Sequence, residues 1–419
     1  MQADQDYPRT LRRRAQTQPA RPAFADDPRV WLRRLLLVVE DDRSVAWGGV
    51  DWYYLKVVLA LLVVGLVFVF SATFPPSDGS TGIGEAFGVL IGQAVAAAIG
   101  MVGLVILAFW VKPRIPVQFA LILFVGGIIL MILCRVGPFA YCVNGSWCWL
   151  KLPGLPRIQP SELTKFVYVL LLAGLMSRKF DDEYTPGEML KRCLIAFGVI
   201  CVVLIMQKDL GMALLVVGVT LAMLFLRGTN AAIVLGLAVV TGLGGLAFAY
   251  SSPARWERIT VFAHPTRDPN HGGYQICQML ATLARGGLSG VGLGMSPDKW
   301  GALPEADTDS IYDVIGGEMG IAGAALVAGL FLVLAFRTLY VGQRSGVAYA
   351  WLVASGVGVC LGLQALINMG VATSSIPCTG ITLPFISNGG TSMVASLLAA
   401  GLVLGVSRMR GEAPGDARC

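Results

Sequence analysis

Residues 54–74 read YLKVVLALLVVGLVFVFSATF, an apolar run interrupted by a single charged residue, Lys56. A helix crosses the hydrocarbon core of a bilayer in about 20 residues, so this run is long enough to span a membrane. Similar runs recur and predict ten transmembrane helices, near 54–74, 86–111, 117–135, 161–177, 193–207, 210–226, 231–250, 311–336, 347–371 and 391–407. The sequence therefore predicts an all-α polytopic membrane protein.

Composition supports this fold class and excludes others. The chain has 419 residues, of which 55% are hydrophobic and only 14% are charged. Soluble domains carry about a quarter charged residues. The net charge of +6 includes no dense basic run, so no nucleic-acid partner is expected. The nine cysteines show no metal-binding spacing, and we predict no metal ligands.

The distribution of cations predicts the orientation in the membrane. Lys or Arg stands at every second junction between predicted spans, which the positive-inside rule assigns to the cytoplasm. Both termini are then cytoplasmic, as an N-terminal tail over 1–53 and a C-terminal tail over 409–419, flanking a membrane domain over 54–408. Two long loops, 136–160 and 251–310, become external, the second directly before the eighth helix. Because long loops on a rigid scaffold often carry function, we expect any chemistry on the outer face.

The strongest local signal is LPEADTDSIYDVIGGEMGIAG at 303–323, where five acids crowd the start of a predicted span. They are Glu305, Asp307, Asp309, Asp313 and Glu318. A helix N-terminus favours one or two acids through its dipole and through capping, but not five. Carboxylates this close to a membrane are costly, which favours a functional site.

A second signal is QPSELTK at 159–165, where Glu162 and Lys165 lie three residues apart on one helix face. Such a pair neutralises itself within a membrane. It either shapes a polar cavity or fixes helix packing.

The segment 255–294 combines arginines with a run of glycines, Gly286, Gly287, Gly290, Gly292 and Gly294. Cations beside exposed backbone amides suit a pyrophosphate, whereas a tight loop with solvated arginines has the same pattern. Farther on, IPCTGITLPFISNGGTS at 376–392 contains prolines and a Gly–Gly pair within a hydrophobic region. It predicts a re-entrant segment, which is tolerated at membrane depth only where it is buried or lines a wet cavity.

Taken in order, these blocks resemble the SEDS family (shape, elongation, division and sporulation), which includes the FtsW and RodA types. The matching residues are Gln159, Pro160, Ser161, Glu162 and Lys165; Asp209, Leu210 and Gly211; Gly273, Tyr274, Gln275 and Gln278; Gly286, Gly287, Gly292, Leu293 and Gly294; Leu303, Pro304, Glu305, Ala306, Thr308 and Asp309; and Leu383, Pro384, Phe385, Gly389 and Gly390. The ordered combination spans about 250 residues and looks more like the division (FtsW) branch than the elongation branch.

The resemblance implies a peptidoglycan glycosyltransferase that polymerises lipid II at the outer face of the bacterial cytoplasmic membrane in cell division. It implies Asp309 as the catalytic base and a class B penicillin-binding protein as partner. We expect the substrate to contact Glu162, Lys165, Arg255, Arg258, Gln275, Gln278, Arg285 and Glu305. The remaining motif residues, Gln159, Pro160, Ser161, Asp209, Gly211, Pro384, Gly389 and Gly390, are expected to be structural. A divalent cation as cofactor is left open. The alternative functions are a lipid-precursor flippase or transporter and a noncatalytic scaffold.

The chain departs from the family pattern at several places. Lys208 stands where the family usually has Pro, Asn388 where it has an aromatic residue, and Cys148 where it has Arg. Asp307 and Ser310 stand in the places of His and Phe. Asp307 adds like charge two residues from Asp309, which is expected to disfavour ionisation of both carboxyls.

Overall fold

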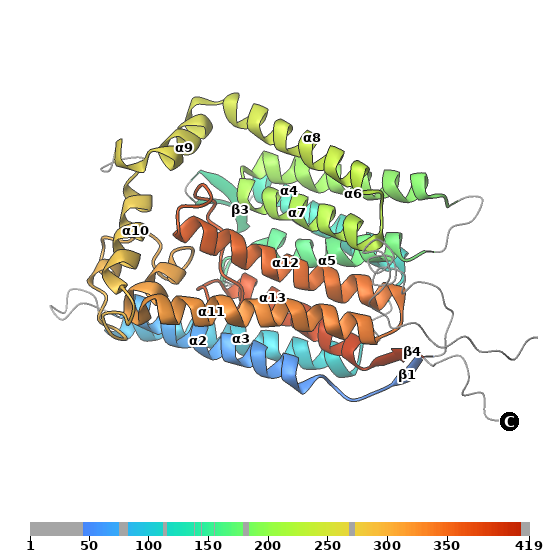
Figure 1. Ribbon diagram of the computed structural model, residues 1–419, viewed down its shortest axis with the longest axis horizontal. Helices are drawn as coiled ribbons and strands as arrows, with labels where there is room; N and C mark the ends of the chain where they lie inside the picture. The colour runs from blue at the N-terminus through green and yellow to red at the C-terminus, as the bar shows by residue number, and fades with distance from the viewer. Residues whose placement is uncertain are drawn as a thin grey trace, which may run out of the picture. The chain divides into compact units, whose positions relative to one another are not determined.

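A computed structural model describes residues 45–74, 83–111, 115–137, 139–143, 145–154, 156–178, 184–267 and 273–411 (Figure 1). Most of the predicted N-terminal tail and the last residues of the predicted C-terminal tail lie outside these ranges. The described chain is almost entirely helical, which confirms the predicted fold class.

Nine helices of the described chain are long and apolar enough to cross a membrane. They are α2 (Trp52–Thr73), α3 (Ile83–Phe109), α4 (Val117–Val136), α6 (Pro186–Gln207), α7 (Leu210–Arg227), α8 (Ala231–Tyr250), α11 (Ile311–Arg344), α12 (Ala348–Ala372) and α13 (Gly390–Ser407). A tenth helix, α5 (Pro160–Met176), has 17 residues and packs against α4, α12 and α13. These ten helices lie where the apolar runs predict them.

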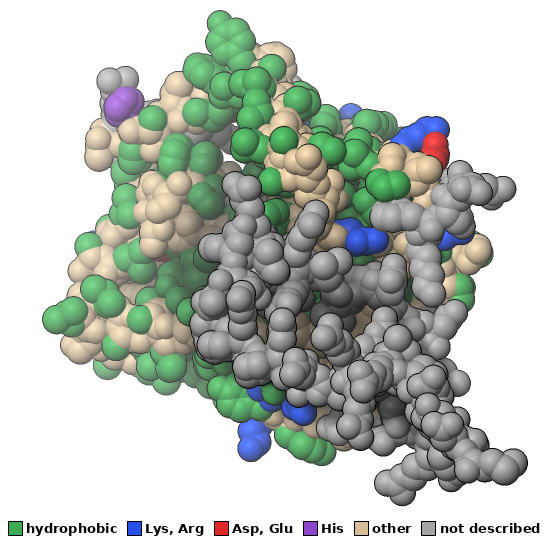
Figure 2. Space-filling model, turned by 45° about the vertical axis from the view of Figure 1, so that its right-hand side comes forward, with side chains coloured by type: hydrophobic (Ala, Val, Ile, Leu, Met, Phe, Trp, Pro, Cys, Tyr) green, Lys and Arg blue, Asp and Glu red, His purple; other side chains and the backbone are tan. Residues whose placement is uncertain are grey.

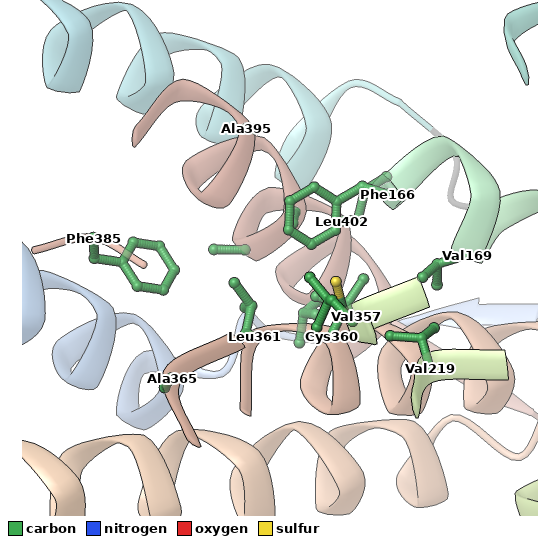
Figure 3. Close-up of a cluster of buried hydrophobic side chains, with 14 of the residues drawn as sticks. Phe166, Val169, Val219, Val357, Cys360, Leu361, Ala365, Phe385, Ala395 and Leu402 are labelled. Carbon is green, nitrogen blue, oxygen red and sulfur yellow. The ribbon is translucent and has the colours of Figure 1, made fainter. Parts of the chain in front are cut away.

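The core lies between α5, α7, α12 and α13. Figure 3 shows Phe166 of α5, Val219 of α7, Leu361 of α12 and Leu402 of α13 converging on one apolar cluster. At the margin of the bundle, α8 has no buried residue. Apolar side chains also cover much of the flank that Figure 2 shows, as expected for a surface that faces lipid.

Two short strands join the ends of the membrane domain. β1 (Val45–Trp47) pairs antiparallel with β4 (Met409–Gly411), in register from Val45 opposite Gly411 to Trp47 opposite Met409. The two ends therefore meet at one end of the bundle, as an even number of crossings requires.

The long loops are more ordered than their sequences suggest. The first carries a hairpin of β2 (Ala140–Val143) and β3 (Ser146–Leu150). The second contains α9 (Pro253–Ala263), η1 (Pro265–Arg267), α10 (Tyr274–Gly286) and η2 (Pro297–Lys299). About half of the predicted 60-residue connection is thus helical, and α10 packs against α11.

The eighth spanning helix, α11, extends beyond the predicted 311–336. It continues to Arg344, and Arg337, which marks the end of the predicted span, forms an ion pair with Asp51 at 2.8 Å. Within α11 the backbone breaks at Gly320, where φ is 66° and ψ is −167°. Only glycine adopts this conformation readily, so the break is built into the sequence.

Candidate active site

A cavity of about 490 Å³ opens beside the start of α11. Its walls come from the β2–β3 hairpin, the turn between α6 and α7, the loop before α11, and the segment between α12 and α13. The polar and charged residues that line it include Gln159, Lys208, Asp209, Glu305, Thr308, Asp309, Thr382, Asn388 and Ser392. Four regions distant in sequence thus meet around one space.

Asp309 is the least compensated acid of this cavity. Its side chain is only 9% exposed, and its Oδ1 has no hydrogen-bond partner among the described residues. Burial, together with the nearby carboxylates of Glu305 and Asp307, raises the pKa of Asp309 to about 7, although a hydrogen bond from Gln275 opposes the rise. Near neutral pH this carboxyl can therefore both accept and release a proton.

The loop that carries Asp309 is held by the segment between α12 and α13. Asn388 donates its backbone N–H to the Asp307 carbonyl at 2.8 Å and its Nδ2 to Asp307 Oδ2 at 2.7 Å. Ser387 Oγ donates to the Thr308 carbonyl at 2.6 Å. Two residues that depart from the family pattern, Asp307 and Asn388, are therefore partners.

A polar side chain of α12 also binds the loop that carries Asp309. Asn368 Nδ2 donates to the backbone carbonyls of Asp309 and Ile381, each at 2.8 Å. Sequence reasoning missed this residue. Its signal was available, because Gln364 and Asn368 place two amides four residues apart in an otherwise apolar span.

Glu305 shapes the turn before Asp309. Its φ of 51° is unusual for a residue other than glycine. Its carbonyl accepts from the N–H groups of Thr308 and Ser310, each at 3.1 Å, and its Oε2 accepts from Thr308 Oγ1 at 3.0 Å. Glu305 lines the cavity as predicted for a substrate contact.

Asp209 lies on the opposite wall and caps α7. Its Oδ1 accepts from Met212 N–H at 3.0 Å, and its Oδ2 accepts from Gln159 Nε2 at 3.4 Å. Burial raises the pKa of Asp209 to about 6, with these two hydrogen bonds opposing the rise. Asp209 therefore satisfies one backbone N–H at the start of α7 while it also lines the cavity.

Glu162 and Lys165 form a closed ion pair. Both are 2% exposed, and Lys165 Nζ lies 2.5 Å from Glu162 Oε2. The same ammonium donates to Gln364 Oε1 at 2.6 Å, and Gln364 Nε2 donates to the Thr382 carbonyl at 2.9 Å. Neither charged residue lines the cavity. Of the two open interpretations, the contacts favour packing.

A second buried ion pair was not predicted. Lys299 and Glu318 have fully buried side chains, with Nζ and Oε1 2.9 Å apart. Ser71 Oγ donates to Glu318 at 2.7 and 2.8 Å, and Lys299 Nζ also donates to the Gly294 carbonyl. Glu318 is therefore not part of the acid cluster around Asp309 that the sequence predicts. The partners come from α2 and η2, so no local pattern reveals them.

The glycine-rich segment after α10 packs on α11. A Cβ on Gly286 would lie 2.1 Å from the Gly316 carbonyl oxygen. The amides of Val291 and Gly292 donate to carbonyls of α11. These two amides are therefore not available to a pyrophosphate, which favours the tight-loop interpretation.

Of the three predicted arginines, only Arg285 has a described side chain, and it does not supply a cation to the cavity. Arg285 pairs with Asp298, whose side chain is buried, and does not line the cavity. Arg255 and Arg258 lie on the backbone of α9, but their side chains are outside the described part of the structure.

Of the other predicted residues, some line the cavity, and others, including the predicted substrate contact Gln278, do not. Gly211 lines it, and a Cβ there would lie 2.7 Å from the Thr379 carbonyl oxygen. Gly389 also lines it, and Gly390 begins α13. The remaining positions are Pro160 and Ser161 at the buried start of α5, Pro384 in the segment between α12 and α13, and half-buried Gln278 in α10. That segment is non-helical and largely buried, as a re-entrant segment requires.

Across the described residues, no three His, Cys, Asp or Glu side chains converge on a position that could hold a metal ion.

Comparison with known proteins identifies the family. The family model of cell cycle proteins of the FtsW, RodA and SpoVE type matches residues 52–412. A probable peptidoglycan glycosyltransferase FtsW of Geobacter sp. is 35% identical over 368 residues, covering 87% of this chain and 99% of that protein. The corresponding protein of Coxiella burnetii is 34% identical over 371 residues, covering 87% and 97%.

Solved structures give the same result. A chain of a peptidoglycan synthase complex that coordinates polymerization and crosslinking aligns with a TM-score of 0.68 at 26% identity, covering 86% of this chain and 98% of that chain. The rod shape determining protein RodA of Thermus thermophilus aligns with a TM-score of 0.62 at 27% identity, with the same coverage. This chain therefore belongs to the FtsW/RodA/SpoVE family of cell cycle proteins, the SEDS family that its motifs resemble.

Proposed function

We propose that this protein is a peptidoglycan glycosyltransferase that polymerises lipid II into glycan strands, with Asp309 as general base. The observation that carries the proposal is the state of the Asp309 carboxyl. It is buried at a cavity wall, its Oδ1 is unpartnered among the described residues, and its pKa lies at about 7. A general base works best when its pKa is close to the operating pH.

The reaction joins an acceptor sugar hydroxyl to the anomeric carbon of a lipid-linked donor. The acceptor oxygen forms the new bond, its proton passes to the Asp309 carboxylate, and the bond between the anomeric carbon and the phosphate oxygen breaks. The electron pair leaves with the polyprenyl pyrophosphate. Pyrophosphate needs countercharge more than protonation, so one carboxylate with a nearby cation suffices.

The remaining parts of the proposal concern place and partner. The protein acts in the bacterial cytoplasmic membrane, with both termini cytoplasmic and the Asp309 cavity facing outward. It works in cell division with a class B penicillin-binding protein that crosslinks the strands. The alternation of cations along the chain supports the orientation, and the FtsW relatives support the role in division.

The test uses the purified full chain in liposomes with lipid II, with and without its cognate transpeptidase. Wild type is compared with Asp309→Asn and with Glu257→Gln, an exposed position on α9. We expect glycan chains from wild type and Glu257→Gln, and a loss of about 10²- to 10⁴-fold in Asp309→Asn.

Other outcomes overturn specific parts of the proposal. Equal polymerisation by Asp309→Asn rejects Asp309 as base and directs attention to Glu305 or Asp307. Transfer of lipid between leaflets without chain growth indicates a flippase. Partner binding without either activity indicates a scaffold.

A further inference from the structure

The cavity beside Asp309 is lined by three carboxyls and one ammonium group. The acids are Asp209, Glu305 and Asp309, and the one cation among the described lining residues is Lys208. An anionic diphosphate that approaches Asp309 is repelled by the carboxylates. It therefore requires a positive group within the cavity.

Lys208 lies at the turn between α6 and α7, exposed toward this space. Its backbone is left-handed, with φ at 62° and ψ at 30°, a conformation that glycine or asparagine usually takes at the end of a helix. The side chain forms no ion pair with any described residue, unlike Arg285, whose charge is taken up by Asp298. Its ammonium group is thus available to a ligand.

The turn that carries Lys208 adjoins the β2–β3 hairpin at the cavity wall. Lys208 and Cys148 both line the cavity, and Ser146 Oγ of β3 donates to the Lys208 carbonyl at 3.4 Å. This contact fixes the Lys208 backbone against the hairpin, beside the space that Asp309 also lines.

We propose that the Lys208 ammonium binds the diphosphate of the lipid-linked donor. This inference rests on the proposed function. In the reaction, Lys208 neutralises the charge that develops on the leaving diphosphate, while Asp309 on the facing loop receives the acceptor's proton.

The test measures steady-state polymerisation and its inhibition by polyprenyl pyrophosphate. Lys208→Gln removes the charge at similar length and Lys208→Arg retains it. Lys191→Gln, an exposed position in the first part of the same helix, is the matched control. We expect roughly a tenfold rise in KM for lipid II in Lys208→Gln, rescue by Lys208→Arg, and no change in the control. Inhibition by polyprenyl pyrophosphate should weaken in parallel, whereas inhibition by polyprenyl alcohol should not change.

A relocation variant sharpens the test. Cys148→Arg in the Lys208→Gln background places a cation at another position of the same cavity wall. This variant should therefore have a lower KM for lipid II than Lys208→Gln alone. If this variant fails to fold, the pyrophosphate-against-alcohol comparison in Lys208→Gln still decides the question. Unchanged KM and unchanged inhibition in Lys208→Gln, with active wild type, overturn the role of Lys208 alone. Inactive wild type with its partner instead counts against the proposed function. A lower melting temperature with unchanged KM assigns Lys208 to ending α6.

Discussion

Two regions of this protein place acids out of water, and they treat them in opposite ways. Glu162 is matched by Lys165 at 2.5 Å, and that ammonium is further bound by Gln364. Asp309 has an unpartnered Oδ1 among the described residues and two other acids, Glu305 and Asp307, acting on it. The first region is closed and the second faces a cavity.

The difference separates packing from chemistry. A buried charge that is fully paired stabilises the arrangement of helices only as long as both partners are present. A buried carboxyl without compensation costs stability and persists where function requires it. Lys299 and Glu318 belong with the first kind, since both side chains are fully buried and mutually bound. Compensation therefore separates Glu162 and Glu318 from Asp309 and Asp313, whose carboxylates have oxygens without partners among the described residues, and of these two only Asp309 lines the cavity.

The largest expected effect is on stability and comes from breaking the buried Glu162–Lys165 ion pair. Lys165→Met leaves the Glu162 carboxylate buried and unpaired, so it should destabilise the fold by about 3–5 kcal/mol. The double variant Glu162→Gln, Lys165→Met should recover most of that loss because no isolated charge remains. Thermal melting of the purified protein in detergent measures both. Equal melting of all three proteins would contradict a packing role for the pair.

The second prediction concerns Asp309, where the substitution should stabilise the fold instead of destabilising it. The pKa of Asp309 is about 7 in the folded protein against an ordinary 3.8, so the folded state holds the proton more tightly than the unfolded chain. Stability is then lost as pH rises from about 4 to about 7. At pH 8, Asp309→Asn should be more stable than wild type by about 2 kcal/mol although it is inactive. Glu257→Gln should melt as wild type, and a destabilised Asp309→Asn would show that the carboxylate is compensated after all.

The same contrast explains what the sequence could predict. Membrane spans depend on local hydropathy, so the nine helices of the described chain that are long and apolar enough to cross a membrane were located, and so was the shorter, charged α5. The end of α11 was placed too early because Arg337 finds its partner in Asp51, 286 residues away. A sequence pattern predicts features that depend on neighbouring residues, such as a membrane span. It does not predict contacts between residues that only folding brings together.

The candidate site shows the same limit. Asp309 was predicted because its motif is local and resembles a known family. Arg285 was predicted as a substrate cation, yet its charge is taken up by Asp298, and the segment between them folds back over α11. Asn368 and Asn388, which hold the Asp309 loop, come from distant segments.

A third prediction follows from the charges around Asp309. As a base it must be ionised, so kcat/KM should rise about tenfold per pH unit below pH 7 and level off above it. The groups acting on it are Glu305 and Asp307 of its own loop and Gln275 of α10, with Asp313 one helical turn away in α11. Asp307→Asn removes one like charge and should shift the rise to lower pH. A profile that does not move would show that Asp307 has no electrostatic effect on the base.

The smallest expected effect tests how the open region is kept in place. Asp307 and Asn388 are joined by a side-chain hydrogen bond of 2.7 Å and a backbone hydrogen bond of 2.8 Å, and only the first depends on their side chains. Asp307→Ala and Asn388→Ala should each lower kcat several-fold, and the double variant should be no worse than either one, a coupling of about 1 kcal/mol. Additive losses would mean that the two residues act independently.

A second pair of variants changes both partners together. Because both depart from the family pattern, the double variant Asp307→His, Asn388→Tyr should retain more activity than either substitution alone. The two departures then represent a single exchange of partners, which fixes the Asp309 loop without neutralising its carboxyl.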